Sequence, residues 1–89
     1  MVYETTTALP PGEIIARAKA FFADRVPNFA AFPEKEGPNY LTLRGQGGEE
    51  VALAIVSSGP TNRVRASTLL FDQAVERFLS TIGRVEVPR

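Results

Sequence analysis

Three arginines are the residues of this 89-residue chain whose type and spacing best suit a chemical role. Arg44, Arg63 and Arg65 lie in segments of alternating apolar and polar residues, which predict strands. Residues two apart in a strand point to the same side of a sheet, so we expect the arginines to share one face. Guanidinium groups bind carboxylates and phosphates through paired N–H donors. One hypothesis is therefore an anionic-ligand site, or an enzyme that acts on an anionic substrate.

The predicted arginine face also carries small, hydroxyl and aromatic side chains. Its candidate ligand or interface residues are Tyr40, Thr42, Arg44, Ala52, Ala54, Val56, Arg63, Arg65 and Ser67. The two alanines and the valine form a shallow, mildly apolar floor in the middle strand. A tyrosine near arginines also occurs in sheets that bind single-stranded nucleic acid, but those sheets stack bases on several aromatic side chains and this face has one. We favour a face that is solvated or that forms an interface over a small-ligand site.

A glycine-rich segment and four glutamates favour a hairpin edge over a catalytic site. The segment 45–48, Gly-Gln-Gly-Gly, has the glycine content of a phosphate-binding loop, but Glu49, Glu50 and a predicted strand follow it instead of a helix. Glu34 and Glu36 lack the alternating acidic ligands and glycine of a calcium loop. We expect these glutamates to be solvated and the glycines to form a hairpin loop.

The chain has no cysteine and no histidine. It therefore has no disulfide and no thiolate nucleophile, and it lacks the commonest general base and the commonest transition-metal ligand. Ser57-Ser58 and Ser67-Thr68 have no histidine to activate them. We expect a domain that is not an enzyme and that holds no metal or cofactor.

Charge and hydropathy argue against two classes of partner. The formal net charge is zero, whereas nucleic acids and anionic membranes are bound through an excess of lysine and arginine. No apolar run approaches the ~18 residues that span a membrane, and the N-terminus lacks the pattern of a signal peptide. We expect no nucleic-acid or membrane partner and a cytoplasmic location.

The elements that position the arginine face follow from apolar spacing along a single domain of residues 1–89. Between Val51 and Phe78 the spacing changes from two, typical of a strand, to about 3.6, typical of a helix. Over the whole chain the spacing predicts strands at 2–8, 40–44, 50–57 and 63–70, helices at 11–25 and 72–82, and an irregular segment at 28–39. Whether residues 2–8 join the sheet is left open.

Local signals refine these elements. Pro11 suits a first helical turn, Asp72 is the expected N-cap of the second helix, and Gly83 is its expected C′ residue. Phe29 and Phe32 are expected to anchor the irregular segment in the core. Val85 and Val87 alternate as in a short edge strand.

Together the elements predict an α+β fold, a two-layer sandwich in which an antiparallel sheet of three to four strands packs on two helices in the order (β)-α-β-β-β-α. The helices are expected to cover the more apolar face of the sheet. That face consists of Leu41, Leu43, Val51, Leu53, Ile55, Val64, Ala66 and Leu70. The arginine face is then the side turned away from both helices.

The two ends of the chain resemble a known superfamily. The segment 5–15, TTTALPPGEII, is similar to the opening of the helix-grip (START and Bet v1-like) proteins, and the segment 69–79, LLFDQAVERFL, is similar to their final strand and long helix. The β-α-β(n)-α order is also that of the wider fold group that includes the halves of TATA-binding protein. The resemblance implies a small apolar ligand or lipid, bound between sheet and helices or across a dimer.

Three functions of different class therefore compete, and the enzyme that acts on an anionic substrate ranks last among them. The favoured one is a homodimer, or another assembly, formed through the second sheet face or an exposed edge strand. The alternative is a carrier of a small apolar ligand.

Overall fold

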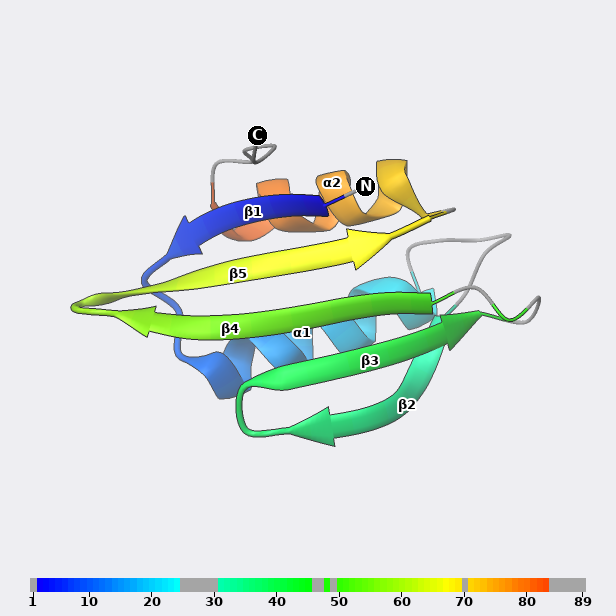
Figure 1. Ribbon diagram of the computed structural model, residues 1–89, viewed down its shortest axis with the longest axis horizontal. Coiled ribbons are helices and arrows are strands. Elements are labelled where there is room, and N and C mark those ends of the chain that lie inside the picture. The colour runs from blue at the N-terminus through cyan, green and yellow to red at the C-terminus, as the bar shows by residue number, and fades with distance from the viewer. Residues whose placement is uncertain (1, 25–30, 46–47, 49, 70, 84–89) are drawn as a thin grey trace.

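The computed structural model describes residues 2–24, 31–45, 48, 50–69 and 71–83. Along the chain these form β1 (Val2–Thr7), α1 (Pro11–Asp24), β2 (Ala31–Gly37), β3 (Tyr40–Gly45), β4 (Glu50–Ser58), β5 (Thr61–Thr68) and α2 (Asp72–Ile82) (Figure 1). Neighbouring strands are antiparallel, and their order across the sheet is β1-β5-β4-β3-β2. The fold is α+β, as predicted, but the sheet has five strands where three to four were expected.

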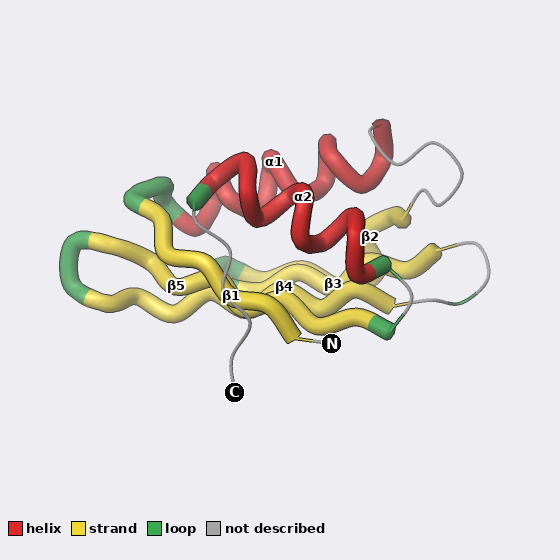
Figure 2. The backbone as a smooth tube through the Cα atoms, turned by 90° about the horizontal axis from the view of Figure 1, so that it is seen from above, coloured by secondary structure: helices red, strands yellow, loops and turns green. Residues whose placement is uncertain are grey.

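Both helices lie against the same side of the sheet (Figure 2). α2 packs over β1 and β5, and α1 packs against β2 and against α2. Burial alternates along the strands in step with this arrangement: in β5, Val64 and Ala66 are buried, whereas Arg63 and Arg65 are exposed. The domain therefore has two layers, and one side of its sheet is left uncovered by the helices.

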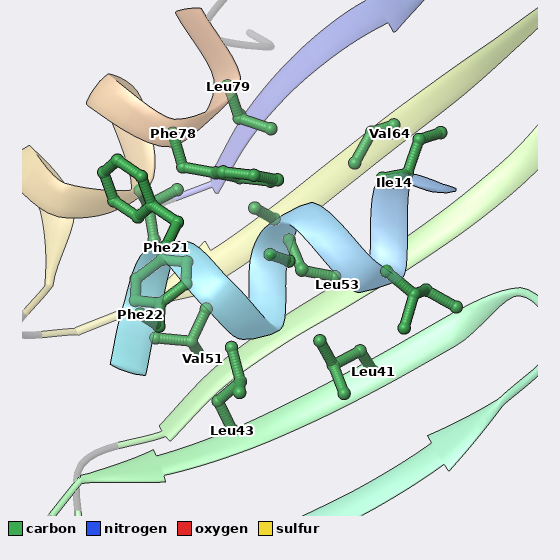
Figure 3. Packing of buried hydrophobic residues seen from close by; sticks show 14 of the residues in the cluster. Ile14, Phe21, Phe22, Leu41, Leu43, Val51, Leu53, Val64, Phe78 and Leu79 are labelled. Carbon is green, nitrogen blue, oxygen red and sulfur yellow. The ribbon is translucent and has the colours of Figure 1, made fainter. Parts of the chain in front are cut away.

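The core lies between the helices and the sheet (Figure 3). The rings of Phe21 and Phe22 on α1 and Phe78 on α2 have centroids 5.3 to 5.9 Å apart in edge-on or tilted pairs, the spacing that aromatic rings prefer. The sheet contributes Leu41, Leu43, Val51, Leu53, Ile55, Val64 and Ala66, each no more than 3% exposed. These residues confirm the predicted apolar face, and its remaining member, Leu70, lies outside the described residues.

β2 corrects the prediction of an irregular segment at 28–39. Pro33 argued against a strand, but β2 is an edge strand, where a missing backbone donor can face away from the sheet. The register shifts between Pro33 and Lys35, so a bulge accommodates the irregularity. Phe32 is 49% exposed and does not anchor the core, because it pairs with Arg44 and so faces the uncovered side.

The β4–β5 hairpin is tighter than predicted. Ser58 pairs with Thr61, so Gly59 and Pro60 alone connect the strands. Gly59 has φ of 65° and a proline keeps φ near −65°, which together fit a type II′ turn. Each strand is therefore longer at the turn than its apolar alternation indicated.

The start of α2 differs from the prediction. Its N-cap is Phe71, and Asp72 is the first helical residue. The carboxylate of Asp72 accepts a hydrogen bond from the hydroxyl of Tyr3, with 3.1 Å between the oxygens. Asp72 therefore ties the first turn of α2 to β1.

The end of α2 also differs. Gly83 was predicted as the C′ residue, but it is the C-cap itself, and its φ of −176° is extended. Glycine fits here because space is short: a Cβ at this position would lie 2.3 Å from Thr5 Oγ1 and 2.5 Å from the carbonyl oxygen of Thr6. The end of α2 approaches the backbone of β1 more closely than any side chain would allow.

Three of the predicted contacts, those of Phe29, Val85 and Val87, lie outside the described residues. Within the described ranges, neither helix is both long and apolar enough to cross a membrane.

Candidate interface on the open sheet face

The open face is the side of the sheet turned away from α1 and α2, which lie behind the sheet in Figure 1. It carries every candidate residue from the sequence, namely Tyr40, Thr42, Arg44, Ala52, Ala54, Val56, Arg63, Arg65 and Ser67. Strand register places them in rows: Tyr40 pairs with Ala54, and Ala54 pairs with Arg65. The candidates thus form one continuous surface over β3, β4 and β5.

The middle of this surface is apolar and shallow. On β4, Ala52 is half-buried, Ala54 is exposed and Val56 is 61% exposed. Tyr40, on β3, is 43% exposed. Small side chains along a central strand allow a second surface to come close to the backbone.

Tyr40 is held over the neighbouring edge strand. Gly37 is its cross-strand partner on β2, and a Cβ built at Gly37 would lie 2.1 Å from Cε1 of the tyrosine ring. The ring therefore occupies the space that a side chain at position 37 would need. This contact explains how a glycine is tolerated in the strand, and it restricts the position of the ring.

Arg44 is bound within the molecule. Its Nε and Nη2 donate to the two carboxylate oxygens of Glu34 at 2.5 and 2.9 Å, Nη1 donates to the carbonyl oxygen of Gly48 at 2.8 Å, and Nη2 also donates to Glu50 Oε2 at 3.2 Å. The hydrogen bonds from Arg44 hold the pKa of the Glu34 carboxyl below its usual range. With Lys35, whose charge also acts on Glu34, this group of two cations and two carboxylates carries no net charge.

Arg63 and Arg65 differ from Arg44, since both are exposed and neither has an ion-pair partner among the residues that the structure describes. They also lie far from it. Arg44 pairs with Glu50 and Arg65 pairs with Ala54, so about 13 Å along the strands and two strand spacings, or about 16 Å in all, separate the two backbone positions. The three arginines share a face, but they do not converge on one anion.

Several residues of the open face were not found from the sequence. Glu4 and Thr6 reach it from β1, and Phe32, Glu34 and Lys35 reach it from β2. In β1 the buried residues Tyr3, Thr5 and Thr7 alternate with more exposed ones, so the two sides of the strand could be told apart. The sequence did not show that β1 pairs with β5, because that pairing depends on the complete fold. The segment that forms β2 carried no usable signal, because its proline and glycines indicated a loop.

In the described part of the chain, no three acidic side chains gather in a way that could hold a metal ion. No protein-family model matches this chain, and no curated protein matches it either. The resemblance to helix-grip proteins therefore stays a prediction.

Proposed function

We propose that this protein is a non-enzymatic domain that forms a homodimer through the open face of its sheet. The observation that carries the proposal is the one-sided covering of the sheet, with Val56, Tyr40 and Phe32 exposed on the uncovered side. Antiparallel sheets with a solvated face alternate cleanly between apolar and polar residues. On β4 that alternation fails, since Ala52, Ala54 and Val56 continue the apolar character onto the second side.

The size of the open face suits a dimer. Five strands at a spacing of about 4.8 Å give a width of about 24 Å, and six residues of strand give a length of about 20 Å. The face therefore covers about 500 Å² in projection, and its accessible area exceeds that because side chains project from it. A standard interface buries roughly 800 Å² on each partner, so this face supplies an area of the required order.

The charges on the open face favour binding over catalysis. The guanidinium of Arg44 is already paired with two carboxylates, and Arg63 and Arg65 are exposed to solvent. A catalytic site gains its strength from groups that are held in a site from which water is excluded. On a flat surface such groups contribute more to the specificity of association.

Light scattering on size-fractionated protein, over concentrations from about 1 μM to several hundred μM, tests the proposal; this range brackets the micromolar affinities of weak dimers. We expect the measured mass to rise to twice the chain mass of 9.7 kDa. A mass of one chain throughout this range would refute the proposal. Native mass spectrometry of the same preparation covers the alternative, because a co-purified small molecule on a monomeric chain would instead favour a ligand carrier.

A further inference from the structure

We infer that the two copies pack face to face about a two-fold axis that runs along β4. This inference rests on the proposed homodimer and specifies its geometry. Residues on β4 then face the same strand of the partner, β5 faces the partner's β3, and β1 faces the partner's β2. The alternative is an axis that crosses the strands, which would place every strand opposite its own copy.

The arginines of β5 favour the axis along β4. Arg63 and Arg65 are exposed cations two residues apart on one strand. An axis across the strands near the rows of Arg63 and Arg65 would bring β5 against β5, so four guanidinium groups would gather beside the two copies of Glu4, the cross-strand neighbour of Arg65. An axis along β4 leaves each residue at the same row along the strands, so it instead places Arg65 opposite Tyr40 on the partner's β3, because both share the row of Ala54. The face of an aromatic ring attracts a guanidinium group.

The outer strands lead to the same choice of axis. Glu4 lies on the open face of β1, in the row of Ala54, and Lys35 lies on the open face of β2, in the row of Ala52. These two rows are two residues apart along the strands. The axis along β4 places β1 over the partner's β2, so these opposite charges approach each other at both rims. An axis that crosses the strands between these two rows would instead place β1 over β1 and β2 over β2, so the nearest charges across each rim would be of like sign.

The centre of the face permits the approach. Stacked sheets pack about 10 Å apart with their strands roughly 30° from parallel. Ala52 and Ala54 lie on the strand that would follow the axis, and Val56 follows them with 61% of its surface exposed. Residues on the axis meet their own copies, and small or β-branched apolar side chains are suited to that symmetric contact.

Cysteine cross-linking distinguishes the two axes, because the chain has no native cysteine. The variants are Ala52→Cys, Val56→Cys and Thr6→Cys. Each is treated alone with a bismaleimide that links two thiols roughly 8 Å apart, a somewhat longer distance than a disulfide can bridge. Thr6 is in the same row as Val56 but on β1, because Thr6 pairs with Arg63 and Arg63 pairs with Val56. Thr6→Cys is therefore a control that matches Val56→Cys in position along the strands and differs from it in position across the sheet.

An axis along β4 predicts that Ala52→Cys and Val56→Cys both form covalent dimers and that Thr6→Cys does not. The two copies of Thr6 would lie about 19 Å apart or more, since β1 and β2 are four strand spacings apart. An axis across the strands at the row of Thr6 would link Thr6→Cys and Val56→Cys but not Ala52→Cys, and that pattern would overturn the inference. So would a dimer, confirmed by light scattering on the same samples, in which none of the three variants cross-links. A monomer by light scattering would instead refute the proposed homodimer itself.

Discussion

The close approach of Gly83, at the end of α2, to β1 gives a quantitative prediction for the replacement of that glycine. In Gly83→Ala the new Cβ would lie 2.3 Å from Thr5 Oγ1 and 2.5 Å from the carbonyl oxygen of Thr6. Thr5 is only 2% exposed and Thr6 contributes a backbone atom, so neither can simply rotate away. An ordinary contact of a Cβ needs at least 3.4 Å, so α2 must move by about 1 Å relative to β1. Overpacking of this kind costs about 1–3 kcal/mol.

Gly12→Ala is the matched control. Gly12 is in α1, and a Cβ there would meet nothing within 4 Å. Alanine in a helix is favoured over glycine by roughly 0.5–1 kcal/mol, so this variant should be more stable than the parent chain. Thermal unfolding measured at one fixed protein concentration should therefore give shifts of opposite sign, with Gly83→Ala lower by roughly 4–20 °C for a domain of this size.

A third variant separates the two explanations for Gly83. If the position required a left-handed backbone, Gly83→Asn would be tolerated better than Gly83→Ala, since asparagine adopts positive φ more readily. If space is short, as the structure indicates, Gly83→Asn should lower the melting temperature at least as much as Gly83→Ala, because asparagine is the larger side chain. An unchanged melting temperature for Gly83→Ala, or a more stable Gly83→Asn, would contradict the packing of α2 on β1.

Two further predictions concern pH. Burial, together with the hydrogen bond to Asp72, raises the pKa of Tyr3, so the stabilisation that Tyr3 provides is complete below the ordinary tyrosine pKa and is lost as the pH rises through the raised value. Tyr3→Phe should therefore be less stable at neutral pH and should lose less stability in alkali, as measured by urea unfolding; equal alkaline slopes for both proteins would contradict this role. The hydrogen bonds from Arg44 lower the pKa of Glu34, so its contribution is present above the ordinary glutamate pKa and is lost as the pH falls through the lowered value. Glu34→Gln should therefore differ from the parent at neutral pH and converge with it in acid, and a difference that persists in acid would argue against the ion pair.

Much of this fold could be predicted from local pattern. The apolar stripe of α1, the alternation in β3, β4 and β5 and the helical spacing of α2 all appear as predicted, because each element buries one side against the same core. The glycine hairpin between β3 and β4 also fits, with Gly48 at φ of 90° and its amide bonded to the carbonyl of Gly45 at 3.0 Å. Period and turn chemistry are local properties, and they were sufficient to place β3, β4 and β5.

The edge strand β2 could not be predicted, because what stabilises it is not local. Pro33 is tolerated because β2 is an edge strand of the sheet that the described residues form, and Gly37 is covered by the ring of Tyr40 on β3. The pairing of Arg44 with Glu34 depends on the same strand, so the sequence placed Arg44 with the exposed arginines. The candidate face was found from the alternation of β3 to β5, but its two rims and its charge pattern required the complete sheet.

Sedimentation equilibrium of Ala54→Glu beside Ala16→Glu tests the proposed homodimer most directly. Ala54 is exposed at the centre of the open face and Ala16 is exposed on α1, so the two variants carry the same change on different layers of the molecule. In a face-to-face dimer two carboxylates at position 54 would lie about 6 Å apart, and their repulsion at an effective dielectric constant of about 20 is about 3 kcal/mol. We therefore expect Ala54→Glu to weaken dimerisation by at least about 100-fold and Ala16→Glu to leave it unchanged. Equal dissociation constants for the two variants would contradict the account.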